Sequence, residues 1–510
     1  MQNSYITSTD YPDPDVIRVD DTYYMVTTSM YFMPGCEILR SYDLVNWEHA
    51  AYVYETLDDT SAQKLEGVQN IYGKGMWAAS FRYHKNTFYI CFVANDTQKT
   101  YLYTSDKIEG PWKKSTIKGF YHDCSLLFDD EKVYIVYGNR EIFLTELKAD
   151  LSGPKENGVH KRILYDKYPG PLGYEGCHIY KIGGKYVLLT CHMPLVNAGR
   201  KVQSCFISDS LDGEFYGGIV VSDDRGFKNL GVAQGCLVDT PEGDWYSMLF
   251  QDMGAIGRIP VLMPVSWDNG IPIFGRYGDV PCEMGGTGAK PNYSYAPLYG
   301  GDDFRYIPDS DGKIHLKEYW QWNHNPDNRL WSVTERPGAL RIYTAKLSQN
   351  VTQAVNTLTQ RMLFPRCSAT VTIDAAGLND GDYACFSAFQ ACYGFIGLHR
   401  KNGKLYLETL VKEAKDTSFF GEEKDTLPGK QKTSTEIENP VIRLKIDAVF
   451  GEDEYVTFSH YKNGIWAQVG FPHKIYFKMD HFTGCRFALS VFSTEKTGGY
   501  ADFLNFQYNC

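Results

Sequence analysis

The segment DVIRVDDTYYMVTT, at residues 15–28, decides the fold. It contains a short apolar strand, a polar turn rich in Asp and a second strand rich in aromatic residues, which is the pattern of a β-hairpin. Four later segments share this outline: SFRYHKNTFYICFV (80–93), SLLFDDEKVYIVYG (125–138), HIYKIGGKYVLLTC (178–191) and CLVDTPEGDWYSMLF (236–250). The first half of the chain is therefore a repeat of one unit.

The spacing of this repeat favours a β-propeller. The aligned second-strand residues stand 65, 45, 53 and 59 positions apart: Tyr24, Tyr89, Tyr134, Val187 and Tyr246. Such intervals accommodate four short strands with variable loops, which is one propeller blade, so five units predict five blades. The alternative is a set of unrelated hairpins in a sandwich. It is disfavoured because no segment of helical period interrupts the series.

The same register places chemically active residues at one end of the predicted propeller. A step back of eleven or twelve positions from the aligned residues reaches Asp13, Asp123 and Glu175 in three repeats, and lands beside Trp77 and Gln234 in the other two. The innermost strands of all blades start at the same face of the central channel, so we expect these side chains to converge there. Each carboxylate alone could be an ordinary turn or surface residue. Their shared register indicates a site.

The second half of the chain predicts a different domain. Residues 274–303 are rich in Gly, Pro and Tyr without periodicity and are interpreted as a linker. Alternating strands then return: ATVTID (369–374), KLYLETL (404–410), VIRLKIDA (441–448), YVTFSHY (455–461) and RFALSVF (486–492). This spacing is typical of an antiparallel β-sandwich of jelly-roll type. We therefore expect an all-β protein, with a five-bladed β-propeller at 1–300 and a β-sandwich at 301–510.

Composition excludes several classes of partner. The formal net charge of -11 argues against nucleic acid, which requires a clustered excess of Lys and Arg. No stretch approaches the ~18 apolar residues of a membrane span, and the first residues lack the pattern of a signal peptide, so a cytoplasmic location is expected. A neutral oligosaccharide is a more suitable ligand for a chain with this net negative charge. The sequence gives no sign of the oligomeric state.

Two features raise the question of metal or disulfide chemistry. The thirteen cysteines show no CxxC pair or Cys/His ligand spacing, and we expect reduced and mostly buried thiols. The loop HNPDN brings His324, Asp327 and Asn328 together in the sequence. A metal site is one interpretation of this loop, and an ordinary polar loop is favoured.

Several of these segments resemble glycoside hydrolase family 43. YPDPDVIRVDDTYYMVTTS with SYDLVNWE is similar to the family's opening, and three further segments are similar to its next blades: WAASFRYHKNTFYI, HDCSLLFDD and EGCHIYKIGGKYVLL. GRIPVLMPVSW resembles the segment that carries a substrate-binding Arg. WQWNHNPDNRLWSVTERPGALRI and NTLTQR resemble the C-terminal sandwich of longer members.

The resemblance implies a role for each matching residue. Asp13 matches the general base, Asp123 the aspartate that modulates the pKa of the acid, and Glu175 the general acid. Trp77 matches an aromatic wall of the sugar pocket, and Arg258 matches the substrate-binding arginine. The resemblance further implies that the sandwich packs on the propeller and sends a loop to the pocket rim.

The sequence also departs from the family pattern. Many members carry a histidine near a calcium ion where this chain has Gln234, and the blade-two WAP reads Trp77-Ala78-Ala79 here. No cofactor is expected for the chemistry; calcium at the propeller axis, with Gln234 as candidate ligand, stays an open alternative. The loop MYFMPG differs from the TFEWFPG type of family β-xylosidases. We expect its residues to shape the sugar pocket: Met30, Tyr31 and Phe32.

These residues predict an inverting, exo-acting glycoside hydrolase. Inversion requires an acid and a base ~6.5–9.5 Å apart, with a water between them. By resemblance, the products are terminal α-L-arabinofuranose, β-D-xylose or both, released from hemicellulose such as arabinoxylan or xylo-oligosaccharides. One alternative is an endo-arabinanase, which would need an open cleft. The other is a non-catalytic carbohydrate-binding protein, which the three carboxylates disfavour.

Overall fold

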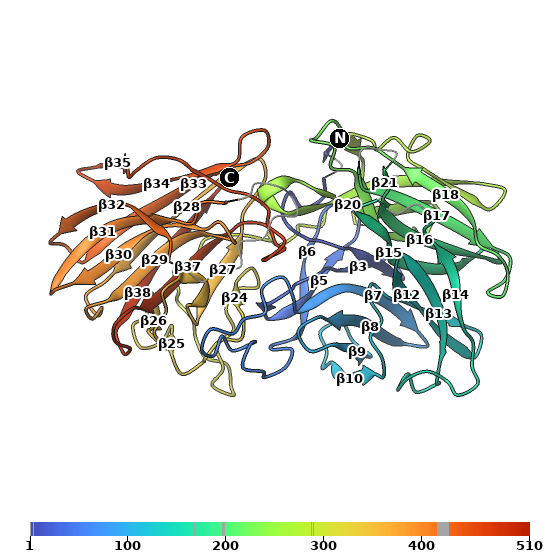
Figure 1. Ribbon diagram of the computed structural model, residues 1–510, viewed down its shortest axis with the longest axis horizontal. Helices are drawn as coiled ribbons and strands as arrows, with labels where there is room; N and C mark the ends of the chain where they lie inside the picture. Colours follow the sequence, from blue (N-terminus) through green and yellow to red (C-terminus); the bar gives the residue numbers. More distant parts are fainter. Residues whose placement is uncertain are drawn as a thin grey trace.

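A computed structural model shows two β-rich bodies side by side, with the propeller in blue to green and the sandwich in yellow to red (Figure 1). It describes residues 2–3, 5–167, 170–195, 199–286, 288, 290–415 and 428–510. Within these ranges the helical elements are two 3-10 turns, η2 (Gly254–Ile256) and η3 (Val351–Gln353). None of the described helices has the length and apolar character needed to span a membrane. All cysteines except Cys282 and Cys510 are buried, as expected.

The first half forms five four-stranded antiparallel sheets, each built from one contiguous segment. Blade one contains β2 (Asp15–Val19), β3 (Thr22–Val26), β5 (Gly35–Ser41) and β6 (Glu48–Tyr54). Blade two contains β7 (Met76–His84), β8 (Thr87–Ala94), β9 (Lys99–Ser105) and β10 (Lys113–Ile117). Blade three contains β11 (Ser125–Asp129), β12 (Lys132–Asn139), β13 (Glu141–Leu147) and β14 (His160–Tyr165).

The last two blades complete the ring. Blade four contains β15 (Leu172–Ile182), β16 (Lys185–Met193), β17 (Val202–Ser208) and β18 (Tyr216–Val221). Blade five contains β19 (Val232–Asp239), β20 (Trp245–Asp252), β21 (Arg258–Asp268) and β22 (Ile271–Phe274). The innermost strands contact one another around the axis, and β19 closes the ring against β2. The five predicted hairpins and the propeller are confirmed.

A buried polar cluster two to five positions beyond the predicted site residues joins the innermost strands. Asp15 accepts a hydrogen bond from Arg82 Nη1 at 2.8 Å, and its other oxygen lies 3.4 Å from His178 Nδ1. Arg82 Nη2 donates to Ser125 Oγ at 2.6 Å. The backbone amide of Val16 points at Cys236 Sγ, 3.1 Å away. Residues from all five blades thus meet in one axial layer. It lies next to the end of the axis that carries Asp13, Asp123 and Glu175, which is called the funnel below.

We expect Asp15→Ala to lower the free energy of unfolding by about 3–5 kcal/mol, because it would leave the Arg82 guanidinium buried without its counter-charge. Urea-induced unfolding would measure the effect. Asp239→Ala is the matched control, since Asp239 forms a more exposed pair with Arg18 at 2.6 Å and its loss should cost less than about 1 kcal/mol. Equal losses in both variants would contradict the stabilising role of the axial cluster.

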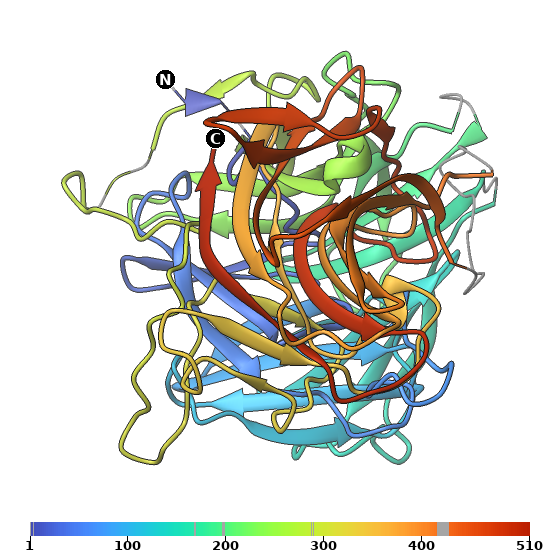
Figure 2. The same cartoon turned by 90° about the vertical axis from the view of Figure 1, so that its left-hand side faces the viewer.

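The second half forms two large antiparallel sheets, and this body faces the viewer in Figure 2. In sheet order, the first contains β32 (Lys430–Ile437), β31 (Lys404–Val411), β30 (Gly394–Lys401), β29 (Asp382–Phe389), β37 (Arg486–Ser493), β27 (Thr357–Arg361), β24 (Gln321–Asn323) and β4 (Phe32–Met33). The second contains β25 (Trp331–Ser332), β26 (Leu340–Tyr343), β38 (Tyr500–Asn509), β28 (Arg366–Asp374), β33 (Val441–Val449), β34 (Tyr455–Lys462) and β35 (Ile465–Gln468), with β36 (His473–Lys474) beside β34. Each alternating segment predicted from the sequence lies in one of these strands.

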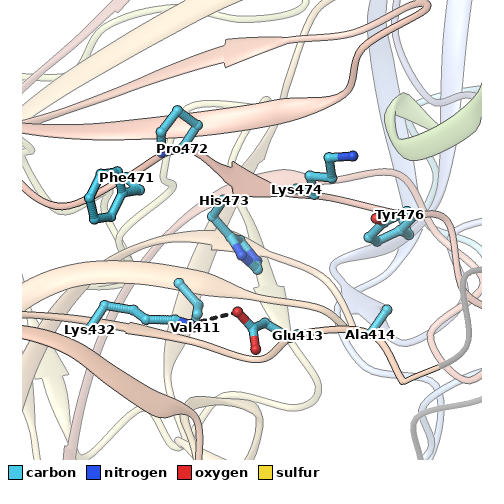
Figure 3. A pocket seen from close by; sticks show the side chains of 9 residues that line it. All are labelled: Val411, Glu413, Ala414, Lys432, Phe471, Pro472, His473, Lys474 and Tyr476. Carbon is cyan, nitrogen blue, oxygen red and sulfur yellow. Dashed lines mark hydrogen bonds and ion pairs between the residues drawn. The ribbon is translucent and has the colours of Figure 1, made fainter.

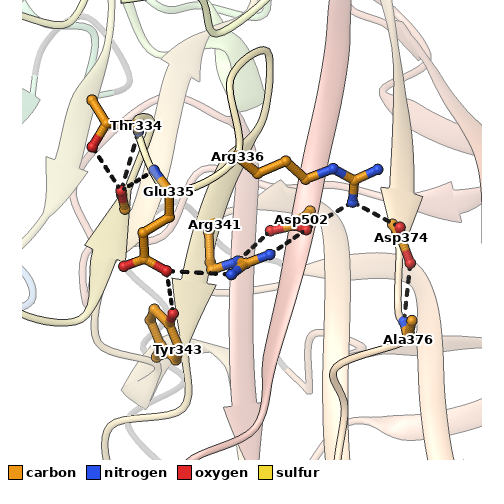
Figure 4. A network of polar contacts seen from close by, with 9 residues as sticks. Thr334, Glu335, Arg336, Arg341, Tyr343, Asp374, Ala376 and Asp502 are labelled. Carbon is orange, nitrogen blue, oxygen red and sulfur yellow. Dashed lines mark hydrogen bonds and ion pairs between the residues drawn. The ribbon is translucent and has the colours of Figure 1, made fainter.

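An ion-pair network crosses the second sheet, away from the propeller carboxylates (Figure 4). Asp502 on β38 pairs with Arg341 Nε at 2.7 Å and with Arg336 Nη1 at 2.8 Å. Arg336 also reaches Asp374 on β28 at 2.7 Å. Each acidic group here is matched by a guanidinium, so the network ties β26, β28 and β38 together.

The two bodies share a sheet, which the sequence did not indicate. The short strand β4, from the first-blade loop, pairs with β24 at the edge of the sandwich sheet. One hydrophobic core also runs through both bodies. At the other end of the propeller, β1 (Gln2–Asn3) pairs with β23 (Glu283–Met284), inside the segment interpreted as a linker. The boundary at 300/301 remains a prediction.

Candidate active site

The predicted register residues lie where the innermost strands begin or bulge. Asp13 and Asp123 come two residues before β2 and β11, and both adopt a left-handed backbone, with φ of 53° and 47°. In β15 the pairing with β16 shifts register on both sides of Glu175. Gly176 follows with φ of 65°, and a Cβ there would lie 2.7 Å from Gln234 Cγ, so only glycine fits. These irregularities turn the polar side chains toward the axis.

Asp13 is a buried carboxylate fixed on two sides. Thr28 Oγ1 donates to Asp13 Oδ2 at 2.6 Å, and Arg258 Nη1 lies 3.2 Å from Asp13 Oδ1. Burial raises the pKa of Asp13 above its ordinary value, and Arg258 and Thr28 oppose that rise. Asp123 adds to the rise from across the funnel. The arrangement keeps the carboxylate charged while making it a stronger base.

Arg258 is in turn held by residues that the sequence did not single out. Its Nε donates to Asp252 Oδ1 at 3.0 Å, and the other oxygen of Asp252 accepts from Lys201 Nζ at 2.7 Å. The guanidinium lies between two aromatic faces, 4.8 Å from the ring centre of Phe250 and 4.3 Å from that of Phe482. Burial alone would raise the pKa of Asp252, but Lys201 and Arg258 lower it. Asp252 therefore stays charged and orients Arg258 toward Asp13.

Glu175 shares its surroundings with Asp123 and with a histidine missed by sequence reasoning. Ligand atoms of Glu175, Asp123 and His122 lie within 4.8 Å of one another. Asp123 Oδ2 accepts the backbone amide of Gly176 at 3.1 Å. Burial raises the pKa of Asp123; His122 opposes that rise and Glu175 adds to it. The structure thus brings Glu175 and Asp123 together, and Asp13 is close enough to Asp123 to feel its charge. Histidine directly before Asp123 was visible in the sequence, but nothing in its spacing pointed to Glu175.

An aromatic wall borders this funnel, and one of its rings comes from the sandwich. Trp77 stacks on Phe482, with ring centres 5.7 Å apart and planes at 23°. Phe482 belongs to a loop whose Gly484 amide donates to Asp10 at 2.9 Å. The predicted loop from the sandwich therefore reaches the site. Its aromatic residue was not identified from the sequence, because the contact joins positions far apart in the chain.

The three residues predicted in the first-blade loop lie behind this wall. Met30, Tyr31 and Phe32 are each at most 1% exposed and form a core cluster with Ile71, against which Trp77 packs. Tyr31 also hydrogen-bonds Thr483, 3.2 Å away. Their burial gives no support to direct contact with a sugar. These side chains pack against Trp77 and Phe482, because the pairing of β4 with β24 places the loop against the sandwich.

Gln234 lies among hydrogen-bond partners from blade four. Its Oε1 accepts from Cys191 Sγ at 3.5 Å, and its backbone amide donates to Gln203 Oε1 at 2.7 Å. Calcium takes six to eight oxygen ligands, usually including carboxylates, whereas these contacts offer amides and a thiol. The prediction of Gln234 as a calcium ligand therefore has no support from its partners.

The other candidate metal residues do not converge. His324 is fully buried and accepts the Ile71 amide at 3.0 Å. Asp327 pairs with Arg329 at 2.7 Å, and Asn328 accepts the Trp331 indole at 2.9 Å. Each side chain has a separate partner, which agrees with the favoured interpretation of a polar loop.

A pocket of about 330 Å³ in the sandwich lies apart from the funnel (Figure 3). Figure 3 shows Glu413 and His473 between the two walls, with Phe471 at one end. Glu413 is the one acidic residue among the described lining residues, and it is paired with Lys432 at 2.6 Å. The described lining of this pocket therefore lacks the pair of carboxyl groups that a glycoside hydrolase needs. We place the chemistry in the propeller funnel.

Glycoside hydrolases use two carboxyl groups, one as base and one as acid. Asp13 and Glu175 are candidates for these two roles. Comparison with known proteins agrees. Residues 3–272 match the model for glycosyl hydrolases family 43, and residues 312–509 match that of the β-xylosidase C-terminal concanavalin A-like domain. The chain belongs to glycoside hydrolase family 43.

Individual relatives resemble the chain over most of its length. A β-xylosidase of Formosa agariphila is 29% identical over 79% of this chain and 76% of its own. A non-reducing end α-L-arabinofuranosidase of Bacteroides ovatus is 27% identical over 67% and 64%. The structure of a bifunctional GH43-CE protein of Bacteroides eggerthii aligns with a TM-score of 0.89 and 36% identity. It covers all of this chain, which spans 63% of that longer protein.

Proposed function

We propose that this protein is an inverting exo-glycosidase that releases terminal α-L-arabinofuranose, β-D-xylose or both from hemicellulose. The observation that carries the proposal is the contrast between two carboxyl groups of one funnel. Asp13 is held by the permanent cation of Arg258, whereas Glu175 lies 3.3 Å from the titratable ring of His122. One group is suited to stay charged, and the other can exchange a proton.

The proposed reaction assigns one step to each of these groups. Asp13 accepts a proton from a water molecule as that water attacks the anomeric carbon. Glu175 gives a proton to the glycosidic oxygen as the bond to the anomeric carbon breaks. Water enters on the face opposite to the departing group, so the anomeric configuration inverts. Arg258 orients Asp13, and the wall of Trp77 and Phe482 offers apolar faces to a sugar ring.

Support for pentoses and for exo cleavage comes from two directions. The relatives named above include a β-xylosidase and a non-reducing end arabinofuranosidase. In this chain the sandwich loop carrying Phe482 borders the funnel beside Trp77, and such a wall favours a pocket for a chain end over an open cleft.

Side-by-side rates on aryl α-L-arabinofuranoside and aryl β-D-xyloside test the proposal, with proton NMR to identify the first anomer formed. We expect pentose release from at least one substrate and an inverted product. A retained product would make Asp13 a nucleophile and overturn the mechanism. Oligomers instead of monomers from linear arabinan would favour the endo-arabinanase alternative, and no turnover of any pentoside would favour a binding protein.

Asp123→Asn is expected to move the basic limb of the pH profile of kcat/KM to lower pH. The negative charge of Asp123 raises the pKa of the neighbouring His122. A negative charge at this place favours a retained proton on the acid side of the funnel. Removing it lowers that pKa, so the active protonated form is lost at lower pH. Asn also tolerates the left-handed backbone. Asp239→Asn at the propeller rim is the control. An unmoved or raised basic limb would contradict this role for Asp123.

A further inference from the structure

His122 lies between the two carboxyl groups on the acid side of the funnel. Its Nε2 is 3.3 Å from Glu175 Oε2 and 3.8 Å from Asp123 Oδ1. The ring meets Trp77 edge to face, with centres 5.7 Å apart. The side chain is 21% exposed, so it is shielded but retains access to solvent. Apart from these two carboxyls, the titratable group acting on it is the thiol of Cys124.

Glu175 Oε2 lies among hydrogen-bond donors. Asn139, at the end of β12, donates its amide to Glu175 Oε2 at 2.5 Å. A protonated His122 would donate to the same oxygen. A general acid must nevertheless carry a proton at the start of the reaction. The positive charge of His122 also offsets much of the negative charge of Asp123 as felt by Glu175. Asp123 alone therefore does not explain where the proton is kept.

We propose that His122 and Glu175 hold the catalytic proton together, and that loss of this shared proton sets the alkaline limit of activity. The inference rests on the proposed function. His122 acts as a positioning residue for the proton, since Glu175 makes the transfer to substrate. When two groups interact this closely, protons leave in steps that belong to the pair. The basic limb should then report the pair instead of Glu175 alone.

The proton balance of the proposed cycle is simple. The Nε2–H bond of His122 breaks as an O–H bond forms on Glu175, leaving a neutral imidazole beside a neutral acid. The O–H bond of Glu175 then breaks as an O–H bond forms on the departing oxygen, while Asp13 takes one proton from the attacking water. Release of that proton from Asp13 to solvent and uptake of one by the His122–Glu175 pair restore the enzyme.

The electrostatics agree with this geometry. Burial alone would lower the pKa of His122, but Asp123 and Glu175 raise it to about 9. The pair would thus keep its proton well above neutral pH. A carboxyl group without this partner has an ordinary pKa of about 4.3.

The first test is the pH profile of kcat/KM for His122→Asn on a pentoside that the wild type cleaves. We expect the basic limb to move to lower pH by at least about one unit. His160→Asn, on the outer strand β14 of the same blade, is the control and should leave the profile in place. An unchanged basic limb, or one moved to higher pH, would overturn the proposal.

The second test does not depend on turnover. Imidazole ¹⁵N shifts of the full-length protein report the titration of His122, assigned by the signals absent from His122→Asn. In Glu175→Gln the pKa of His122 should fall, because the neutral amide removes a neighbouring charge. If the pKa of His122 is the same in the wild type and in Glu175→Gln, the proposed proton sharing is wrong, even if the wild type releases pentoses. An inactive wild type whose His122 responds to Glu175 would instead count against the proposed function alone.

Discussion

Asp13→Asn should lower kcat/KM on every pentoside substrate by about 10²–10⁴-fold, the usual contribution of a general base. The amide has almost the same size and can still accept from Thr28, but it cannot take a proton from water. Asp252 also pairs with Arg258, but its second oxygen is held by Lys201 Nζ at 2.7 Å. The loss should therefore be similar for natural and activated substrates, because both need the attacking water.

The control for this variant is Asp20→Asn. Asp20 adopts the same left-handed backbone, with φ of 54°, but it lies exposed in the turn of the first hairpin. Both substitutions should leave thermal unfolding nearly unchanged, since Asn tolerates this conformation. Initial rates on aryl pentosides measure the difference. Activity near the wild-type level in Asp13→Asn would remove Asp13 from the mechanism.

Glu175→Gln should have an equally large effect, but only where the leaving group needs a proton. Natural glycosides depart as alkoxides, and we expect their hydrolysis to fall by about 10²–10⁴-fold. An aryl group with an acidic phenol departs without help, so its release should fall far less. Gln keeps the side-chain length and can still accept from Asn139. The measurement is the ratio of rates on xylo-oligosaccharide and activated aryl substrate.

Glu146→Gln is a suitable control for that experiment. Glu146 is a buried glutamate on β13 that pairs with Lys155 at 2.5 Å, at a distance from the funnel along the blade. Its replacement should affect stability without changing the ratio of the two substrates. Equal losses on both substrates in Glu175→Gln would show that this residue is not the proton donor.

The register of the hairpins was predictable because it is local. Strand, turn and strand lie within fifteen positions of sequence, and their alternation is set by which side chains are buried. Once the hairpins align, the positions of Asp13, Asp123 and Glu175 follow, since each lies eleven or twelve positions before the aligned residue of its hairpin. The resemblance to family 43 then supplied roles that spacing alone does not give.

The remaining site residues depend on contacts between distant segments. Lys201 and Asp252 approach one another from neighbouring blades, and Asn139 reaches Glu175 from the end of β12. Phe482 arrives from the other body entirely. No periodic pattern marks such positions. The two-residue strand β4 was missed for a related reason, because so short a segment has no alternation to detect and forms only where β24 offers an edge.

The shared sheet has a consequence for how the protein is made. A ribosome delivers all five blades before the strands that flank Phe482, so the carboxylates can be in place long before the aromatic wall is complete. Early in that interval β24, the partner of β4, has not yet been made, and the apolar face that later meets the sandwich is exposed to solvent or to chaperones. Catalytic competence should therefore appear late in synthesis, at the moment when the last strands dock and not when the propeller closes.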